Sequence, residues 1–206
     1  MTASAFDLAL YAFALFILFL TPGPVWLALI ARAVSGGFQS AWPLAFGVVV
    51  GDVIWPLLAI LGLAWITSEV DYAMSILRWV ACAFFVWLGW TVIRNADASV
   101  SSDSRLTRPG KLAGFLAGVA VILSNPKAIL FYLGVLPGFF DLSSVTALDI
   151  AAICFLSLLV PLIGNLILAY TVHHARSLIA SPKAMYRLNL SSGWMLILVG
   201  AILPFT

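Results

Sequence analysis

A stretch with two prolines, Thr21-Pro22-Gly23-Pro24, lies in the middle of an apolar run that extends from Leu8 to Ala31 without a charged residue. Each proline lacks a backbone N–H and clashes with the carbonyl group four residues back, so a regular helix cannot pass undisturbed through both. Backbone groups released inside a bilayer must pack against protein or line a wet cavity. The break is therefore a candidate binding site, and an ordinary proline kink is the alternative.

A second break is predicted at Ser124-Asn125-Pro126, which Lys127 follows. Half-helices that begin near Gly23 and Asn125 would direct unpaired N–H groups and the positive end of a helix dipole toward a bound carboxylate. The polar side chains at the breaks, Thr21, Ser124 and Asn125, could bind the same ligand or could simply cap the helix ends.

Asp52 is the one acidic residue well inside an apolar segment. A charged Asp at the centre of a membrane helix costs about 2.5 to 3.5 kcal/mol on insertion scales, so such a residue is usually paired or functional. We expect Asp52 to bind a substrate ammonium group or to carry an exchanged proton. A structural ion pair between Asp52 and Lys127 is the alternative. Asn165 occupies the position that corresponds to Asp52 in the second half of the chain and is neutral.

The composition predicts an integral membrane protein, because 64% of the 206 residues are hydrophobic and 9% are charged. The net charge of +2 gives no indication of a nucleic-acid partner. Cys82 and Cys154 are 72 positions apart in apolar segments, which favours two small buried side chains over a redox or metal site. No cofactor is predicted. The residues before Leu8 contain no Lys or Arg, so we expect the first apolar segment to be retained rather than cleaved as a signal peptide.

Six apolar segments are long enough to span a bilayer as helices, which takes about 20 residues each. They cover residues 5–33, 40–66, 74–94, 112–138, 148–173 and 186–204. The turns after the first, third and fifth segments contain eight of the ten Lys and Arg residues. By the positive-inside rule these turns are cytoplasmic, and both termini are expected outside.

The segments form two related blocks, residues 1–98 and 110–206, within a single membrane domain. Gly51-Asp52 corresponds to Gly164-Asn165, and Trp87-Leu88-Gly89 corresponds to Leu198-Val199-Gly200. Three helices per block would invert the second block relative to the first. Interrupted segments at matching positions of inverted halves indicate the binding site of a transporter near the membrane midplane.

The chain resembles the LysE/RhtB family, six-helix carriers that move amino acids out of bacterial cells. The resemblance covers nearly the whole chain and rests on these motifs: Thr21-Pro22-Gly23-Pro24, Ser35-Gly36-Gly37, Gly47-x-x-x-Gly51-Asp52, Asn125-Pro126-Lys127, Phe131 and Leu136-Pro137-x-Phe139. It implies an all-α protein of the bacterial inner membrane whose partners are the lipid bilayer and a small-molecule substrate.

The expected function is export of amino acids or related small zwitterions, with protons as the coupling ion and without enzymatic activity. Substrate binding is assigned to Thr21, Pro22, Gly23, Pro24, Ser124, Asn125, Pro126 and Asn165, and coupling to Asp52 and Lys127. An exporter of metal ions or of other small metabolites is the alternative, although few metal-binding side chains lie in the membrane. A thiol-disulfide carrier is more distant, since it would need paired cysteines at the breaks. Glycine faces such as Gly47-x-x-x-Gly51 should pack helices within the chain, and could instead mediate a homodimer.

Overall fold

The computed structural model describes residues 2–69, 73–94, 96, 109–142, 144–174 and 182–202, and these residues contain helices and no β-strand. This part of the chain confirms the predicted all-α class. The helices are α1 (Ala5–Leu20), α2 (Pro24–Glu69), α3 (Ala73–Arg94), α4 (Lys111–Leu123), α5 (Pro126–Leu130), α6 (Ala147–His174) and α8 (Pro182–Ile202). A π-helical turn η1 (Phe131–Val135) and a 3-10 turn η2 (Leu136–Gly138) continue α5.

The helices begin and end where the sequence provides caps and breakers. The side chains and backbones of Ser4 and Asp7 form a capping box at the start of α1. Helix α2 reverses direction at Gly37, where φ is 71°. A side chain at Gly37 would be strained by this backbone conformation, and its Cβ would lie 2.9 Å from Nδ1 of His173. The turn predicted at Ser35-Gly36-Gly37 is therefore present, inside α2.

Two of the described helical segments are long and apolar enough to cross a bilayer, namely Ala147–His174 and Pro24–Gly62, the latter of which includes the reversal at Gly37. A third span can be formed by Lys111–Leu123 together with Pro126–Gly138, which meet at a bend of 48°. Helix α1 has only 16 residues because it ends at the first break. The described helices thus account for two or three of the six predicted spans, and the arrangement of six spans remains a prediction.

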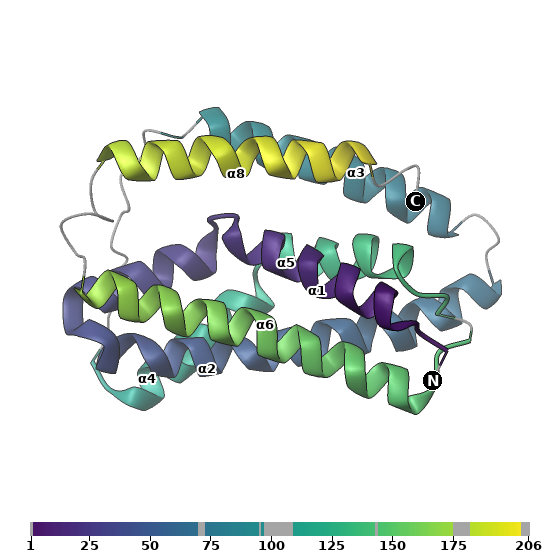
Figure 1. Cartoon of the computed structure of the whole chain (residues 1–206), viewed down its shortest axis with the longest axis horizontal. Coiled ribbons are helices and arrows are strands. Elements are labelled where there is room, and N and C mark those ends of the chain that lie inside the picture. Colours follow the sequence, from purple (N-terminus) through teal and green to yellow (C-terminus); the bar gives the residue numbers. More distant parts are fainter. Residues whose placement is uncertain are drawn as a thin grey trace.

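The helices form a bundle in which α2 packs on α4 and α6, α1 lies along α6, and α3 pairs with α8. Consecutive segments run from one end of the bundle to the other in alternating directions (Figure 1). The start of α1 and the end of α8 lie at one end. The reversal of α2, the start of α4 and the end of α6 lie at the opposite end.

Glycines allow the helices to approach closely, as their spacing predicted. A Cβ at Gly118 of α4 would lie 2.2 Å from the carbonyl oxygen of Leu44 in α2. A Cβ at Gly47 would lie 2.0 Å from the carbonyl oxygen of Phe115. In the pair of α3 and α8, a Cβ at Gly89 would lie 2.5 Å from the carbonyl oxygen of Gly193. Packing within the chain thus explains these glycines.

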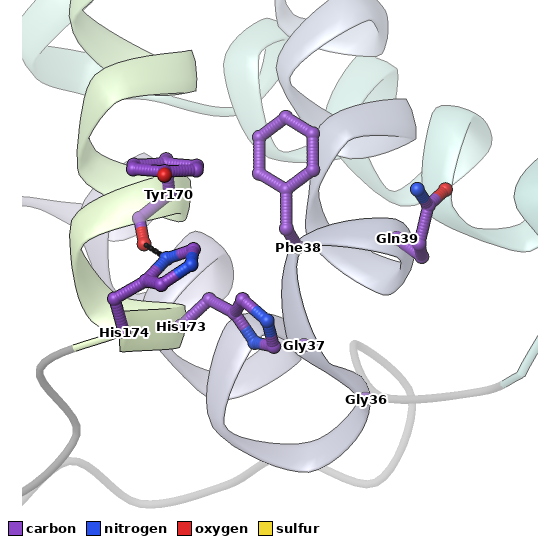
Figure 2. A pocket seen from close by; sticks show the side chains of 7 residues that line it. All are labelled: Gly36, Gly37, Phe38, Gln39, Tyr170, His173 and His174. Atoms are coloured by element: carbon purple, nitrogen blue, oxygen red, sulfur yellow. Dashed lines mark hydrogen bonds between the residues drawn. The ribbon is translucent and has the colours of Figure 1, made fainter.

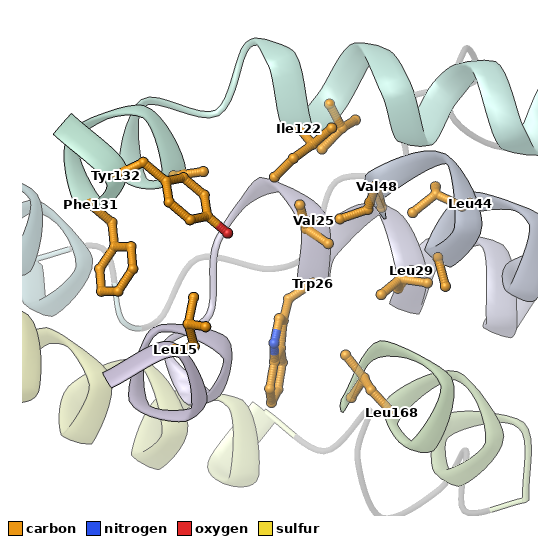
Figure 3. Close-up of a cluster of buried hydrophobic side chains, with 14 of the residues drawn as sticks. Leu15, Val25, Trp26, Leu29, Leu44, Val48, Ile122, Phe131, Tyr132 and Leu168 are labelled. Atoms are coloured by element: carbon orange, nitrogen blue, oxygen red, sulfur yellow. The ribbon is translucent and has the colours of Figure 1, made fainter. Parts of the chain in front are cut away.

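The buried apolar core lies where α1, α2, α4, η1 and α6 meet (Figure 3). Leu15, Trp26, Ile122, Tyr132 and Leu168 contribute to it from these five elements. Many large apolar side chains on the outside of the helices are exposed instead, among them Phe13, Leu61, Trp87, Leu116 and Ile167. A surface this apolar is suited to lipid rather than water.

Candidate functional site

The first helix break follows α1, where Thr21 takes an extended conformation with φ −79° and ψ 115°. The Thr21 hydroxyl donates a hydrogen bond to the carbonyl oxygen of Ile17 at 2.9 Å, and Thr21 is 1% exposed. The indole Nε1 of Trp26 donates to the carbonyl oxygen of Phe19 at 2.7 Å. The Trp26 side chain thus satisfies a carbonyl group near the end of the broken helix, and the Thr21 hydroxyl is a second donor to the Ile17 carbonyl oxygen, which also accepts the Thr21 backbone N–H at 3.2 Å.

Lys127 connects the second break to the first. Its Nζ donates to the carbonyl oxygen of Thr21 at 2.6 Å and to that of Leu18 at 2.9 Å. Gly23 lies beside the same side chain, since a Cβ there would be 3.5 Å from Nζ. The ammonium group of a residue at the start of α5 therefore binds the carboxyl-terminal end of α1, where the helix dipole favours positive charge.

The second break separates α4 from α5. The Ser124 hydroxyl bonds back to the carbonyl oxygen of Ala120 at 2.7 Å, and both Ser124 and Pro126 are exposed. Asn125 is 3% exposed, and its Oδ1 accepts a hydrogen bond from the Lys127 backbone N–H at 3.2 Å, which caps α5. Trp55 donates from Nε1 to the carbonyl oxygen of Ile122 at 3.3 Å, as Trp26 does at the first break.

Asp52 is 4% exposed in the middle of α2 and has few partners. Its Oδ1 accepts one long hydrogen bond, 3.5 Å from the hydroxyl of Tyr132 in η1. Its Oδ2 is buried and has no hydrogen-bond partner. A buried carboxyl group with a free oxygen is available for a donor that binds from outside the chain.

The ion pair between Asp52 and Lys127 that the sequence allowed is not formed. The charged atoms of the two side chains interact electrostatically but are not within the 4.0 Å of an ion pair. The backbone carbonyl groups at the end of α1 satisfy the ammonium group instead. Asp52 and Lys127 therefore form no direct ion pair in this structure.

Asn165 of α6 is 2% exposed, and its amide forms no hydrogen bond with the residues that the structure describes. The preceding residue, Gly164, packs on the last turn of α1, because a Cβ there would lie 2.8 Å from the Phe19 ring. Gly51, which precedes Asp52, packs in the same manner on Ile122 in the last turn of α4. Gly51 and Asp52 therefore lie beside the second break, whereas Gly164 and Asn165 lie beside the first.

Three buried hydroxyl groups near Asp52 were missed by the sequence analysis. Tyr11 OH lies 2.6 Å from Ser157 Oγ, and Ser157 in turn donates to the carbonyl oxygen of Ile153 at 2.7 Å. Tyr11, Tyr132 and Ser157 are each fully buried. A tyrosine in an apolar run carries no local signal that distinguishes it from core packing, so their grouping required the fold.

A separate pocket of about 250 Å³ lies at the far end of α6 (Figure 2). It is lined by Gly36, Gly37, Phe38, Gln39, Tyr170, His173 and His174. His174 Nδ1 lies 2.9 Å from the carbonyl oxygen of Tyr170, and the two rings are 4.1 Å apart. These contacts account for His174 at the end of the helix.

Metal-binding side chains do not cluster in the described part of the chain: no three of its His, Cys, Asp and Glu residues are placed to hold an ion together. Cys82 and Cys154 are free thiols.

A helical membrane protein with interrupted helices and buried ionisable groups beside the interruptions has the features of a membrane carrier. The chain belongs to the LysE type translocator family, whose model matches residues 16–205. A membrane protein of Synechocystis sp. described as uncharacterized is 32% identical over 191 residues, which cover 92% of this chain and 91% of the relative.

Other relatives have names that state an activity. The leucine efflux proteins of Salmonella choleraesuis and Salmonella typhimurium are each 29% identical over 151 residues, which cover 68% of this chain and 71% of each relative. No solved structure matches the chain. Family membership and the apolar helices together place the protein in a membrane.

Proposed function

We propose that this protein exports a neutral amino acid across the bacterial inner membrane by proton antiport. The observation that carries the proposal is the contact between the two breaks, where Lys127 binds the end of α1 while the nearby Asp52 keeps a free buried oxygen. The printed activity of the Salmonella relatives, leucine efflux, supports an amino-acid substrate.

The chemistry of the breaks suits a zwitterion. The first N–H groups of α2 and of Pro126–Gly138 would bind the substrate carboxylate, with the buried amide of Asn165 as a further donor. The free oxygen of Asp52 would bind the substrate ammonium group. Asp52 and Lys127 supply one charge of each sign, so an additional charge on the substrate would have no partner among these buried residues.

Coupling would use Asp52 as the group that exchanges a proton for the substrate. The second half has the neutral Asn165 at the corresponding position, so there is one titratable carboxyl group for one proton. Moving one charge through 100 mV corresponds to about 2.3 kcal/mol, or roughly a 50-fold gradient. This free energy is sufficient for useful export.

The architecture we propose is a single membrane domain of two inverted repeats, residues 1–98 and 110–206, with both termini outside. Supporting it, Gly51 packs on the end of α4 as Gly164 packs on the end of α1, and Trp55 and Trp26 donate to the last carbonyl groups of these helices. The breaks would then lie near the membrane midplane, where alternating access requires the site.

The test is efflux from proteoliposomes loaded in turn with each common amino acid, with and without an imposed proton gradient. Wild type is compared with Asp52→Asn and with the control Asp7→Asn, which alters a carboxyl group in the cap of α1. Gradient-stimulated efflux of neutral amino acids, lost in Asp52→Asn and retained in Asp7→Asn, is the expected result. Efflux that survives Asp52→Asn with its gradient dependence would remove Asp52 from the coupling step.

Absence of efflux for every amino acid would contradict the proposal. The same vesicles loaded with divalent metal ions would then test the remaining alternative, a metal-ion exporter. A thiol-disulfide carrier would require Cys82 and Cys154, so alanine variants of both that leave efflux unchanged would remove that alternative.

A further inference from the structure

The carboxyl-terminal end of α1 forms an oxygen-lined site that is filled by a side chain of the protein itself. The carbonyl oxygens of Leu18 and Thr21 converge on Lys127 Nζ at 2.9 and 2.6 Å. Backbone carbonyl groups at the end of a half-helix are the ligands that broken-helix carriers use for Na⁺. We propose that this is a monovalent-cation site which Lys127 occupies permanently with its ammonium group, so that the protein neither binds nor requires Na⁺.

The site is built to hold a cation. Thr21 is 1% exposed and Lys127 is 7% exposed, so the carbonyl groups are shielded from water that could replace the ammonium group. The end of the α1 dipole and the carboxyl group of Asp52, which interacts electrostatically with Lys127, both favour positive charge there. Without a cation, the buried carbonyl oxygen of Thr21 would lose its donor, and the carbonyl oxygen of Leu18 would keep only the backbone N–H of Thr21 at 3.2 Å.

The cation that occupies this site determines which ion gradient can be coupled to transport. A free Na⁺ can enter and leave, and its gradient can then perform work. The ammonium group is fixed to α5, more than a hundred residues along the chain from its acceptors, and stays near the site at any ion concentration. Sodium would therefore be excluded by competition within the chain rather than by the lack of suitable ligands.

Removal of the ammonium group should expose the site to small cations. In Lys127→Met the carbonyl groups of Leu18 and Thr21 remain in place, and the methionine side chain cannot donate to them. A hard cation that prefers oxygen ligands, such as Na⁺ or Li⁺, can then take the vacated position. The matched control is Lys111→Met, because Lys111 is exposed and its Nζ lies 5.6 Å from the centre of the Trp42 ring.

The experiment is thermal unfolding of the purified full-length protein in detergent, in NaCl, LiCl or choline chloride at equal ionic strength. We expect Lys127→Met to have a lower Tm than wild type in choline chloride and to recover at least about 3 °C in NaCl or LiCl. Wild type and Lys111→Met should have the same Tm in the three salts. Because this readout does not involve transport, it is independent of whether amino acids are the substrate.

Two results would overturn the proposal: a Lys127→Met protein whose Tm is the same in NaCl, LiCl and choline chloride, or a wild-type protein that Na⁺ stabilises specifically. The second result is measured on the unmodified chain and needs no variant. Lys127→Gln retains a neutral donor and provides a second variant if Lys127→Met does not fold, with a smaller rise in Tm expected in NaCl or LiCl because its amide can still donate to a carbonyl group.

Discussion

The hydroxyl of Tyr132 lies 3.5 Å from Oδ1 of Asp52 and is the one hydrogen-bond donor to this carboxyl group within the described residues. A buried carboxyl group with a single long hydrogen bond costs stability, because it has lost its water and gained little in return. Asp149 shows the contrast: its two carboxylate oxygens accept five hydrogen bonds of 3.1 Å or less from Thr2, Ala3 and Thr146. The incomplete partnering of Asp52 is therefore best explained by binding.

Asp52→Asn should stabilise the folded protein while it abolishes coupled transport. Asparagine has nearly the same shape but removes the cost of a buried, poorly partnered carboxyl group, so we expect a gain of about 1 to 3 kcal/mol. Thermal unfolding in detergent at pH 8 measures it. The control Asp7→Asn should lower Tm slightly, since Asp7 accepts hydrogen bonds from Ser4 at 3.1 and 2.6 Å. A lower Tm for Asp52→Asn would mean that its carboxyl group is structural.

Tyr132→Phe should reduce transport with little effect on folding. The ring remains in the core against Phe131, while the donor to Asp52 is lost. A hydrogen bond to a charged group contributes about 1.5 to 3 kcal/mol, so the initial efflux rate should fall by about 10-fold or more if this bond shortens during the cycle. Tyr170→Phe is the control, because Tyr170 is 55% exposed at the far end of α6. Equal efflux by both variants would argue against a role for the Tyr132 hydroxyl.

The sequence was sufficient to predict the all-α class, the two breaks and the close packing at the glycines. Proline chemistry acts on neighbouring residues, so α1 ends at Leu20 and α4 ends at Leu123 close to the prolines themselves. Likewise, the four-residue spacing of Gly47 and Gly51 indicates a narrow helix face before the partner helix is known.

The partners of the polar side chains could not be predicted, because they are brought together by packing between distant segments. Lys127 had an acidic candidate partner in Asp52, yet backbone carbonyl groups bind it. Every residue has a backbone carbonyl group, so the sequence does not indicate which of these groups will accept a hydrogen bond from a side chain. Trp26 and Trp55 were similarly unremarkable as apolar residues, although each donates to the last carbonyl groups of a broken helix.

Gly118→Ala should destabilise the contact between α2 and α4 strongly. The added methyl group would lie 2.2 Å from the carbonyl oxygen of Leu44, and a backbone atom cannot move aside as a flexible side chain can. We expect a loss of about 1 to 3 kcal/mol, measured as a lower Tm of the purified protein. Gly62→Ala is the control, because no atom lies within 4 Å of its added methyl group, and alanine favours the helix. Equal Tm values for the two variants would contradict the packing.

Asn125 offers a way to separate capping from binding. Its Oδ1 caps α5 by accepting from the Lys127 N–H, and serine or aspartate can accept the same hydrogen bond. Asn125→Ser and Asn125→Asp should therefore fold with Tm values near that of wild type, whereas Asn125→Ala should lose about 1 kcal/mol.

A carboxylate at position 125 would repel the substrate carboxylate that we place at this break. We expect efflux to persist in Asn125→Ser and to fall by at least about 10-fold in Asn125→Asp, which corresponds to 1.4 kcal/mol or more of repulsion. Wild-type efflux from a stable Asn125→Asp protein would show that the second break is capped by Asn125 but does not bind the carboxylate.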